Sequence, residues 1–227
     1  DYLKAGIYDK AIDCLERLSK NDEYRLDALR SLLRIRCTEH DWEAAIESAR
    51  RLEKEASEDH SADIAHFHCE LAELAVKQKN PEAAEREVSL ALLEKPYSPR
   101  ALMLAGDFAF QKNQVKEAVE DWEKLRQHSE DHFPLVFSRL VKGYDALGDA
   151  AGAQAVIDYA LNRFPTSEVV EQAMKRAFKD KGQQAAAEIV SKGLSGHPTL
   201  GTLSVAMEFR KMIAPDDEQL QGLSEML

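Results

Sequence analysis

The feature that most constrains this 227-residue chain is a short pattern that recurs along it at nearly constant spacing. Each copy has a turn residue, two or three polar or small residues, and a closing alanine. The copies are GIYDKA (6–11), HDWEAA (40–45), KNPEAA (79–84), NQVKEA (113–118), GDAAGA (148–153) and KGQQAA (181–186). Their alanines are separated by 34, 39, 34, 35 and 33 residues, a period that is typical of helix-turn-helix solenoids.

The apolar residues around this pattern match the tetratricopeptide repeat, in which a large residue and a Gly precede the alanine and an aromatic follows it. In the fourth copy these residues are Leu102, Gly106, Ala118 and Trp122. A proline follows the alanine at the same distance in three copies, at Pro96, Pro165 and Pro198. The sequence therefore predicts an all-α fold, a tetratricopeptide right-handed superhelical solenoid of antiparallel helix pairs.

The repeat also predicts the domain organisation, because each helix pair has an apolar face that only a neighbouring pair can bury. We expect a tetratricopeptide array over residues 1–213, with a truncated first repeat, about five complete repeats and a last helix at about 200–213. Residues 214–227 are expected to be a linker and the start of a further helix. The 39-residue spacing predicts a longer connection within residues 53–63. Both chain ends fall inside expected helices, so we expect a fragment of a longer protein.

Composition excludes several classes of function. The chain has only 10 Gly and 7 Pro. Its 41 acidic residues outnumber its 30 basic residues, which gives a net charge of −11. This charge disfavours nucleic acid as a partner. The three cysteines, Cys14, Cys37 and Cys69, form no C-x-x-C pair, which fits a reducing cytosolic setting. No catalytic signature motif occurs, and no apolar run approaches the roughly 18 residues that cross a bilayer.

A solenoid of this kind usually holds a peptide or a partner domain in a groove lined by the first helix of every repeat. The expected function is therefore protein binding, without catalysis. The predicted groove-facing residues are Arg30, Arg34, His66, Cys69, Glu73, Met103, Asp107, Phe110, Ser138 and Lys142.

The stretch IAHFHCELA (64–72) has the residue types of a metal site, but its spacing argues against one. His66 and His68 are two residues apart, so on a helix they point about 200° away from one another. We expect His68 to fill the core with one ring nitrogen bonded locally, and His66 and Cys69 to face the groove. A metalloenzyme that uses His66, Cys69 and Glu73 is the alternative from another functional class.

Several runs resemble the middle of the lipopolysaccharide assembly protein B family. These runs are DYLKAGIYDKAIDCLERL, RLDALRSLLRI, HDWEAAIESARRLEK and IAHFHCELA, with a weaker continuation to GLSGHPTL (193–200). Arg36 departs from the repeat, which places an aromatic at that position, so the packing of the second repeat is expected to differ.

The resemblance implies a non-enzymatic adaptor on the cytoplasmic side of the bacterial inner membrane. Members of the family bind the deacetylase LpxC and help to present it to the membrane protease FtsH, and a regulator of the PbgA/YejM type opposes them. The family has an N-terminal membrane helix and a C-terminal rubredoxin-like metal site, both outside the matched segment, so no cofactor is expected here. A generic bacterial tetratricopeptide scaffold for another assembly is the closest alternative.

Overall fold

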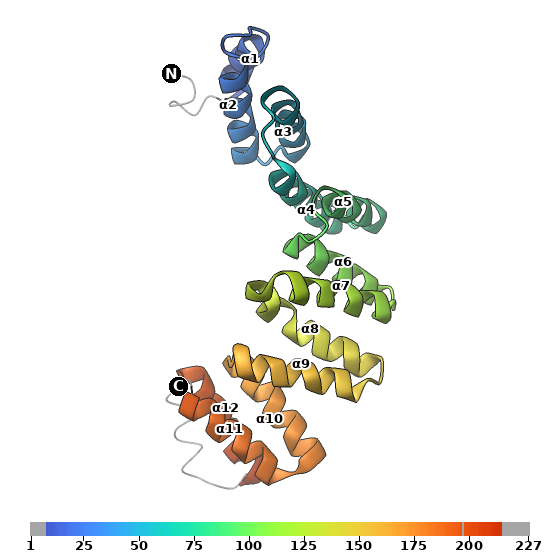
Figure 1. Ribbon diagram of the computed structural model, residues 1–227, viewed down its shortest axis with the longest axis vertical. Helices are drawn as coiled ribbons and strands as arrows, with labels where there is room; N and C mark the ends of the chain where they lie inside the picture. The colour runs from blue at the N-terminus through green and yellow to red at the C-terminus, as the bar shows by residue number, and fades with distance from the viewer. Residues whose placement is uncertain (1–7, 197, 215–227) are drawn as a thin grey trace. The chain divides into compact units, whose positions relative to one another are not determined.

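The computed structural model describes residues 8–196 and 198–214 of the chain (Figure 1). Within these ranges the chain forms twelve α-helices and one 3-10 helix, and no strand occurs. The predicted all-α fold is therefore confirmed. The further helix predicted within residues 214–227 falls almost entirely outside the described residues.

The chain divides into two units, residues 1–132 and 133–227. The helices of the first unit are α1 (Tyr8–Leu18), α2 (Arg25–Thr38), α3 (Trp42–Ala56), α4 (Ser61–Lys77), α5 (Pro81–Glu94), α6 (Pro99–Gln111) and α7 (Val115–His128), followed by the 3-10 helix η1 (Glu130–His132). The helices of the second unit are α8 (Phe133–Ala146), α9 (Ala150–Arg163), α10 (Ser167–Lys181), α11 (Gln183–Gly196) and α12 (Leu200–Ile213).

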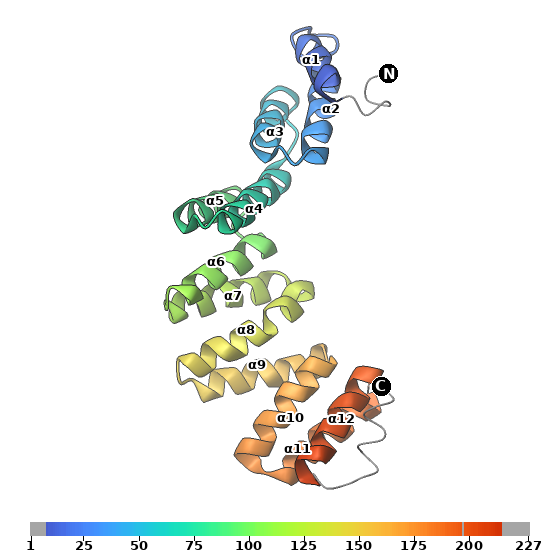
Figure 2. The same cartoon turned by 180° about the vertical axis from the view of Figure 1, so that it is seen from behind.

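Consecutive helices form hairpins that pack side by side, as both views of the ribbon show (Figure 2). These pairs are α2 with α3, α4 with α5 and α6 with α7 in the first unit, and α8 with α9 and α10 with α11 in the second. In the first unit α1 packs on α2, and in the second α12 packs on α10 and α11. This is the pairing that a tetratricopeptide repeat requires.

Each hairpin turns at the residue that opens the recurring pattern. That residue, or in the last copy its neighbour, has a positive φ, a conformation that lets the chain reverse within three residues, or within one in the last hairpin. These positions are His40, Lys79, Asn113, Gly148 and Gly182. The next helix is then capped in three hairpins, where Asp41, Asn80 or Asp149 accepts a hydrogen bond from the backbone N–H three residues on.

The six closing alanines are all buried, with at most 3% of their surface exposed. Their small side chains allow the paired helices to approach closely. The close approach is tightest at Gly106, where an added Cβ would lie 2.6 Å from Cδ1 of the buried Trp122. A small and a large residue therefore face each other across the α6–α7 pair, as the repeat pattern indicates.

The predicted longer connection within residues 53–63 is wrong. Helix α3 continues to Ala56 and α4 begins at Ser61, which leaves a four-residue connection, the same length as the one between α5 and α6. The extra residues instead lengthen the helices, and α4 has 17 residues. Glu, Lys and Ala dominate the start of this segment, and their high helix propensity explains why α3 continues through it.

Arg36 replaces the expected aromatic with a network of hydrogen bonds that joins α1, α2 and α3. Its Nη1 donates to the carbonyl oxygen of Ala44 at 2.9 Å and to Oγ of Ser48 at 2.6 Å, and its Nη2 donates to Glu16 Oε1 at 2.6 Å. Only 12% of the Arg36 side chain is exposed. A largely buried guanidinium that forms three hydrogen bonds thus stands in for apolar packing in this repeat.

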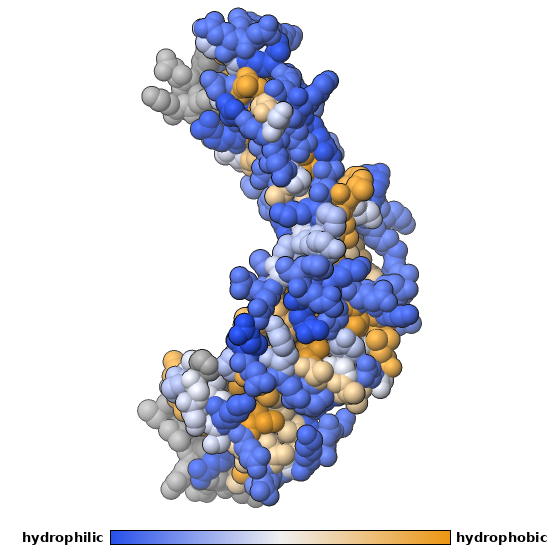
Figure 3. Space-filling view, in the orientation of Figure 1, coloured by the Kyte–Doolittle hydropathy of each residue, from blue (hydrophilic) through white to orange (hydrophobic). Residues whose placement is uncertain are grey.

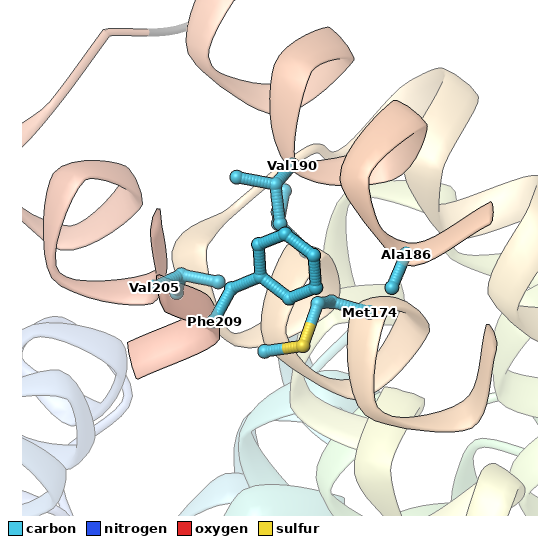
Figure 4. Packing of buried hydrophobic residues seen from close by; sticks show 6 residues of the cluster. Met174, Ala186, Val190, Val205 and Phe209 are labelled. Carbon is cyan, nitrogen blue, oxygen red and sulfur yellow. The ribbon is translucent and has the colours of Figure 1, made fainter. Parts of the chain in front are cut away.

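The core of the second unit closes around Phe209 (Figure 4). The ring of Phe209 from α12 lies among Val205 of the same helix, Met174 of α10 and Val190 of α11. Met174 is fully buried and Phe209 is 7% exposed. Helix α12 is therefore an integral part of this unit.

Candidate functional site

Arg100 of α6 joins three side chains of α4 on the face where the sequence predicts a groove. Its Nη1 donates to Glu70 Oε1 at 2.6 Å, its Nη2 donates to Glu73 Oε1 at 2.6 Å, and His66 Nδ1 lies 3.1 Å from Nη1. Burial lowers the pKa of Arg100, but the hydrogen bonds and charges of Glu73 and Glu70 outweigh it and raise the pKa overall. The guanidinium is thus permanently charged and already paired.

His66 and Glu73 lie on one side of α4, as predicted, but Arg100 is not among the predicted groove residues. A signal for it existed, because Arg100 precedes the predicted groove residue Met103 by three positions and so shares its side of the helix. Periodicity alone did not show that α4 and α6 approach closely enough for Arg100 to pair with Glu70 and Glu73.

The prediction that Cys69 faces the groove is wrong. Its side chain is fully buried and packs with Ala65 of α4, Ala91 of α5 and Ala101 of α6. Burial raises the pKa of the Cys69 thiol to about 11, so the thiol is neutral at physiological pH. Three residues turn a helix by about 300°, so Cys69 is rotated by about 60° from His66, enough to place it where three helices meet.

The two histidines of this stretch have separate roles, as their spacing predicts. His68 is buried, and its Nδ1 lies 2.8 Å from Glu87 Oε2 on α5. His66 is exposed beside the rings of Trp42 and Phe67, at centroid distances of 6.2 and 6.0 Å. Trp42 itself stacks on Phe67 at 5.6 Å, a packing role.

The structure does not bring His66, Cys69 and Glu73 together as a set of metal ligands. Over residues 8–196 and 198–214, no group of three or more His, Cys, Asp or Glu side chains is placed to hold a metal ion. Cys69 points into the core, and Arg100 occupies the space between His66 and Glu73. The geometry therefore gives no support to the metalloenzyme alternative.

Arg30 and Arg34 are both exposed on α2, but they differ in their surroundings. Arg30 donates through Nε to Glu58 Oε1 at 3.1 Å and through Nη1 to Asp27 Oδ1 at 3.1 Å. The hydrogen bond and charge of Glu58 raise the pKa of Arg30, and the same bond lowers the pKa of Glu58. Arg34 is exposed and forms no ion pair with the described residues.

The predicted groove residues of α6 are all partly exposed. Phe110 does not stand free, because its ring packs on the buried Trp122 of α7 at a centroid distance of 5.7 Å. Phe110 therefore supports the α6–α7 pair, and its role in a groove stays a prediction. Met103 and Asp107 remain accessible in part.

In the second unit, Ser138 links α8 to α10. Its Oγ donates to Glu168 Oε1 and accepts a hydrogen bond from Gln172 Nε2 at 2.8 Å. Between the same two helices, Arg176 Nη1 of α10 pairs with Asp145 Oδ1 of α8 at 2.8 Å. Lys142 is exposed on α8. Several polar side chains on this surface are thus already bonded within the unit.

The chain is similar along nearly its whole length to lipopolysaccharide assembly protein B of Escherichia coli K12, with 25% identity over 223 residues, or 98% of this chain. The predicted resemblance is confirmed. The Haemophilus influenzae protein of the same name is 24% identical over 83% of this chain. The chain spans 57% of the length of the first relative and 47% of the second.

Among solved structures, PilF of Pseudomonas aeruginosa matches with a TM-score of 0.51 and 17% identity, over 96% of this chain and 99% of that one. At this identity the likeness shows the fold alone, and it agrees with the tetratricopeptide helix pairs. No protein-family model matches the chain. In the part of the chain that the structure describes, no helix combines the length and apolar character needed to span a bilayer.

Proposed function

We propose that the chain is a non-enzymatic tetratricopeptide scaffold in lipopolysaccharide assembly. The observation that carries this proposal is the similarity to lipopolysaccharide assembly protein B over 98% of the chain, which extends across every helix pair. The fold supports it, because stacked helix pairs present extended surfaces suited to holding other proteins.

The specific role we propose is that of an adaptor on the cytoplasmic side of the bacterial inner membrane. It binds a deacetylase of the LpxC type and presents it to the protease FtsH, and a regulator of the PbgA/YejM type opposes this step. This segment acts through protein contacts and has no cofactor of its own. The support for this role is the family resemblance of the sequence, together with exposed side chains such as Arg34 that have no partner in the described chain.

The proposal is tested by measuring the lifetime of the deacetylase. Membranes that contain FtsH are mixed with the LpxC-type deacetylase of the same organism, with or without the full-length protein, and the remaining deacetylase is followed by immunoblot. We expect its half-life to shorten when the full-length protein is present. A second FtsH substrate, degraded at an unchanged rate, is the control for a general effect on the protease.

An unchanged half-life, with no measurable binding between the two purified proteins, would reject the adaptor role. The generic scaffold for another assembly would then be the better description, since the helix pairs do not depend on which partner is bound.

A further inference from the structure

The polar residues on the predicted groove face are mostly occupied by partners in the same chain. Glu58 and Asp27 pair with Arg30, and Arg100 pairs with Glu73 and contacts His66. A partner protein would have to break these bonds and replace them with its own. This exchange contributes little net free energy to binding. Binding hot spots are instead found where a large side chain enters an apolar pocket. The first unit has such a pocket elsewhere.

The pocket lies between α5 and α6, and we name it the α5–α6 crevice. It consists of two adjoining cavities of about 360 and about 280 Å³, which share Glu85, Phe108 and Lys112. Its apolar lining is Val76, Pro81, Ala84, Val88, Leu92 and Phe108. In the space-filling view, apolar surface interrupts the hydrophilic surface over the α4–α5 pair (Figure 3).

The depth and the rim of the crevice suit an inserted side chain. Ala84 and Val88 are buried beneath it, whereas Val76 at the rim is 48% exposed. The larger cavity lies near the lower end of the 300–1,000 Å³ range of small-molecule sites, so it has room for one or two large side chains. Leaving such apolar surface in water is unfavourable, and covering it would stabilise a complex.

Of the two lysines that line the crevice, one forms an ion pair and the other does not. Lys112 Nζ donates to Glu85 Oε2 at 2.6 Å across the crevice, from α6 to α5. Lys79 lines the larger cavity and forms no ion pair with the described residues. Its turn is held by backbone bonds, from Lys79 N–H to the Val76 carbonyl at 3.0 Å and from Asn80 N–H to the Ala75 carbonyl at 2.9 Å. The backbone of Lys79 is thus held in place, and its exposed ammonium group, without an ion pair among the described residues, stands beside the apolar cavity.

We infer that the α5–α6 crevice is the anchor pocket for the partner protein, which inserts one large apolar side chain next to a carboxylate that pairs with Lys79. A carboxylate on the partner complements the positive charge of Lys79, so a protein segment that carries one is favoured over a purely apolar occupant. The inference deepens the proposed function, because the identity of the partner, the LpxC-type deacetylase, rests on that function. It moves the main contact from the predicted groove to the crevice.

The first arm of the test measures the affinity of the deacetylase for variants of this protein by calorimetry. We expect Val76→Asp to weaken binding on the order of tenfold or more, the loss that defines a hot spot, and Lys79→Glu to weaken it as well. Leu93→Asp is the matched control, since Leu93 lies on α5, is 75% exposed and does not line the crevice. Arg34→Glu probes the predicted groove. Circular dichroism checks that each variant remains folded.

The second arm does not depend on the deacetylase. Methyl signals of Val76 and Ala84 are followed by NMR during titration with the peptides acetyl-Asp-Leu-Phe-amide and acetyl-Lys-Leu-Phe-amide. We expect the acidic peptide to shift these signals in the wild type and the basic peptide to be preferred by Lys79→Glu. Decanoate is titrated as an apolar carboxylate that is not a peptide.

The two arms separate the inference from the proposed function. If the deacetylase binds the wild type and Val76→Asp equally well, or if neither peptide shifts the crevice signals, the inference is wrong and the adaptor role is untouched. If the deacetylase does not bind but the acidic peptide does, the adaptor role fails and the crevice chemistry is supported. Stronger shifts with decanoate, or self-association that Val76→Asp abolishes, would overturn the inference in favour of a lipid or a second copy.

Discussion

At the scale of single residues, the smallest side chains set how closely the helices pack. Gly106 lets the backbone of α6 pass directly over the indole ring of Trp122, which is 2% exposed. Phe110 covers another part of the same ring. The large ring of Trp122 therefore fits because Gly106 has no side chain, and neither residue can be replaced alone.

Gly106→Ala should destabilise the protein. The added methyl group would overlap the Trp122 ring, and overpacking of this kind costs about 1–3 kcal/mol, reduced by a gain in helix propensity of up to about 1 kcal/mol. Urea denaturation followed by circular dichroism measures the free energy of unfolding. Gly196→Ala is the control, since nothing lies within 4 Å of the position its Cβ would take. Equal free energies for the two variants would contradict the close packing.

At the scale of elements, the short connection between α3 and α4 is held by a histidine between two carboxylates. His60 Nδ1 lies 2.9 Å from Asp63 Oδ2, and His60 Nε2 lies 3.1 Å from Glu58 Oε2. Its backbone N–H donates to Glu53 Oε1 of α3 at 3.3 Å, and Arg30 of α2 shares Glu58. The ring thus ties Asp63 in the first turn of α4 to Glu58 in the connection, and Glu58 in turn pairs with Arg30 of α2.

The contribution of His60 to stability should depend on pH. Burial lowers the pKa of His60, but the hydrogen bonds and charges of Asp63 and Glu58 outweigh it and raise the pKa above 6.5. A raised pKa means that the folded state favours the protonated ring. The stabilisation is therefore complete below the unfolded pKa and is lost as the pH rises through the folded pKa.

His60→Gln should consequently lower Tm more at about pH 6 than at about pH 8.5, on either side of the ordinary histidine pKa. Thermal melts at the two values measure the difference. His132→Gln provides the comparison, because His132 Nδ1 bonds to the hydroxyl of Ser129 at 2.8 Å and not to a carboxylate. If His60→Gln lowers Tm by the same amount at both pH values, the ring stabilises the protein without its charge.

At the scale of the whole molecule, the helix pairs within each unit pack on the pairs next to them in sequence. Stability in such an architecture is approximately the sum of local terms, so damage in one repeat should remain near that repeat. The core around Phe209 and Met174 in the second unit shares no residue with the clusters around Leu29 and Ala91 in the first.

Phe209→Ala should therefore raise hydrogen exchange in α10, α11 and α12 and leave α4 and α5 unchanged. Removing a buried Phe side chain costs about 3 kcal/mol or more. Hydrogen exchange followed by mass spectrometry of proteolytic fragments maps the effect. Leu203→Ala in the same helix is the control, since Leu203 is 47% exposed. Faster exchange throughout the first unit would indicate that the two units unfold together.

The sequence by itself determined the helical fold, the hairpin turns and the different directions in which His66 and His68 point. These properties depend on spacing along the chain, and a helix converts spacing directly into direction. The turn residues His40 and Lys79 and the buried alanines lie where the repeat predicts them.

Only the tertiary structure decided which surface residues are available. The pairing of Arg100 with Glu70 and Glu73 depends on how α4 and α6 approach each other, and so does the burial of Cys69. The crevice beside Phe108 exists because α5 and α6 leave space between them that their own side chains do not fill. Such features arise from contacts between residues far apart in sequence, so the periodicity of one helix does not encode them.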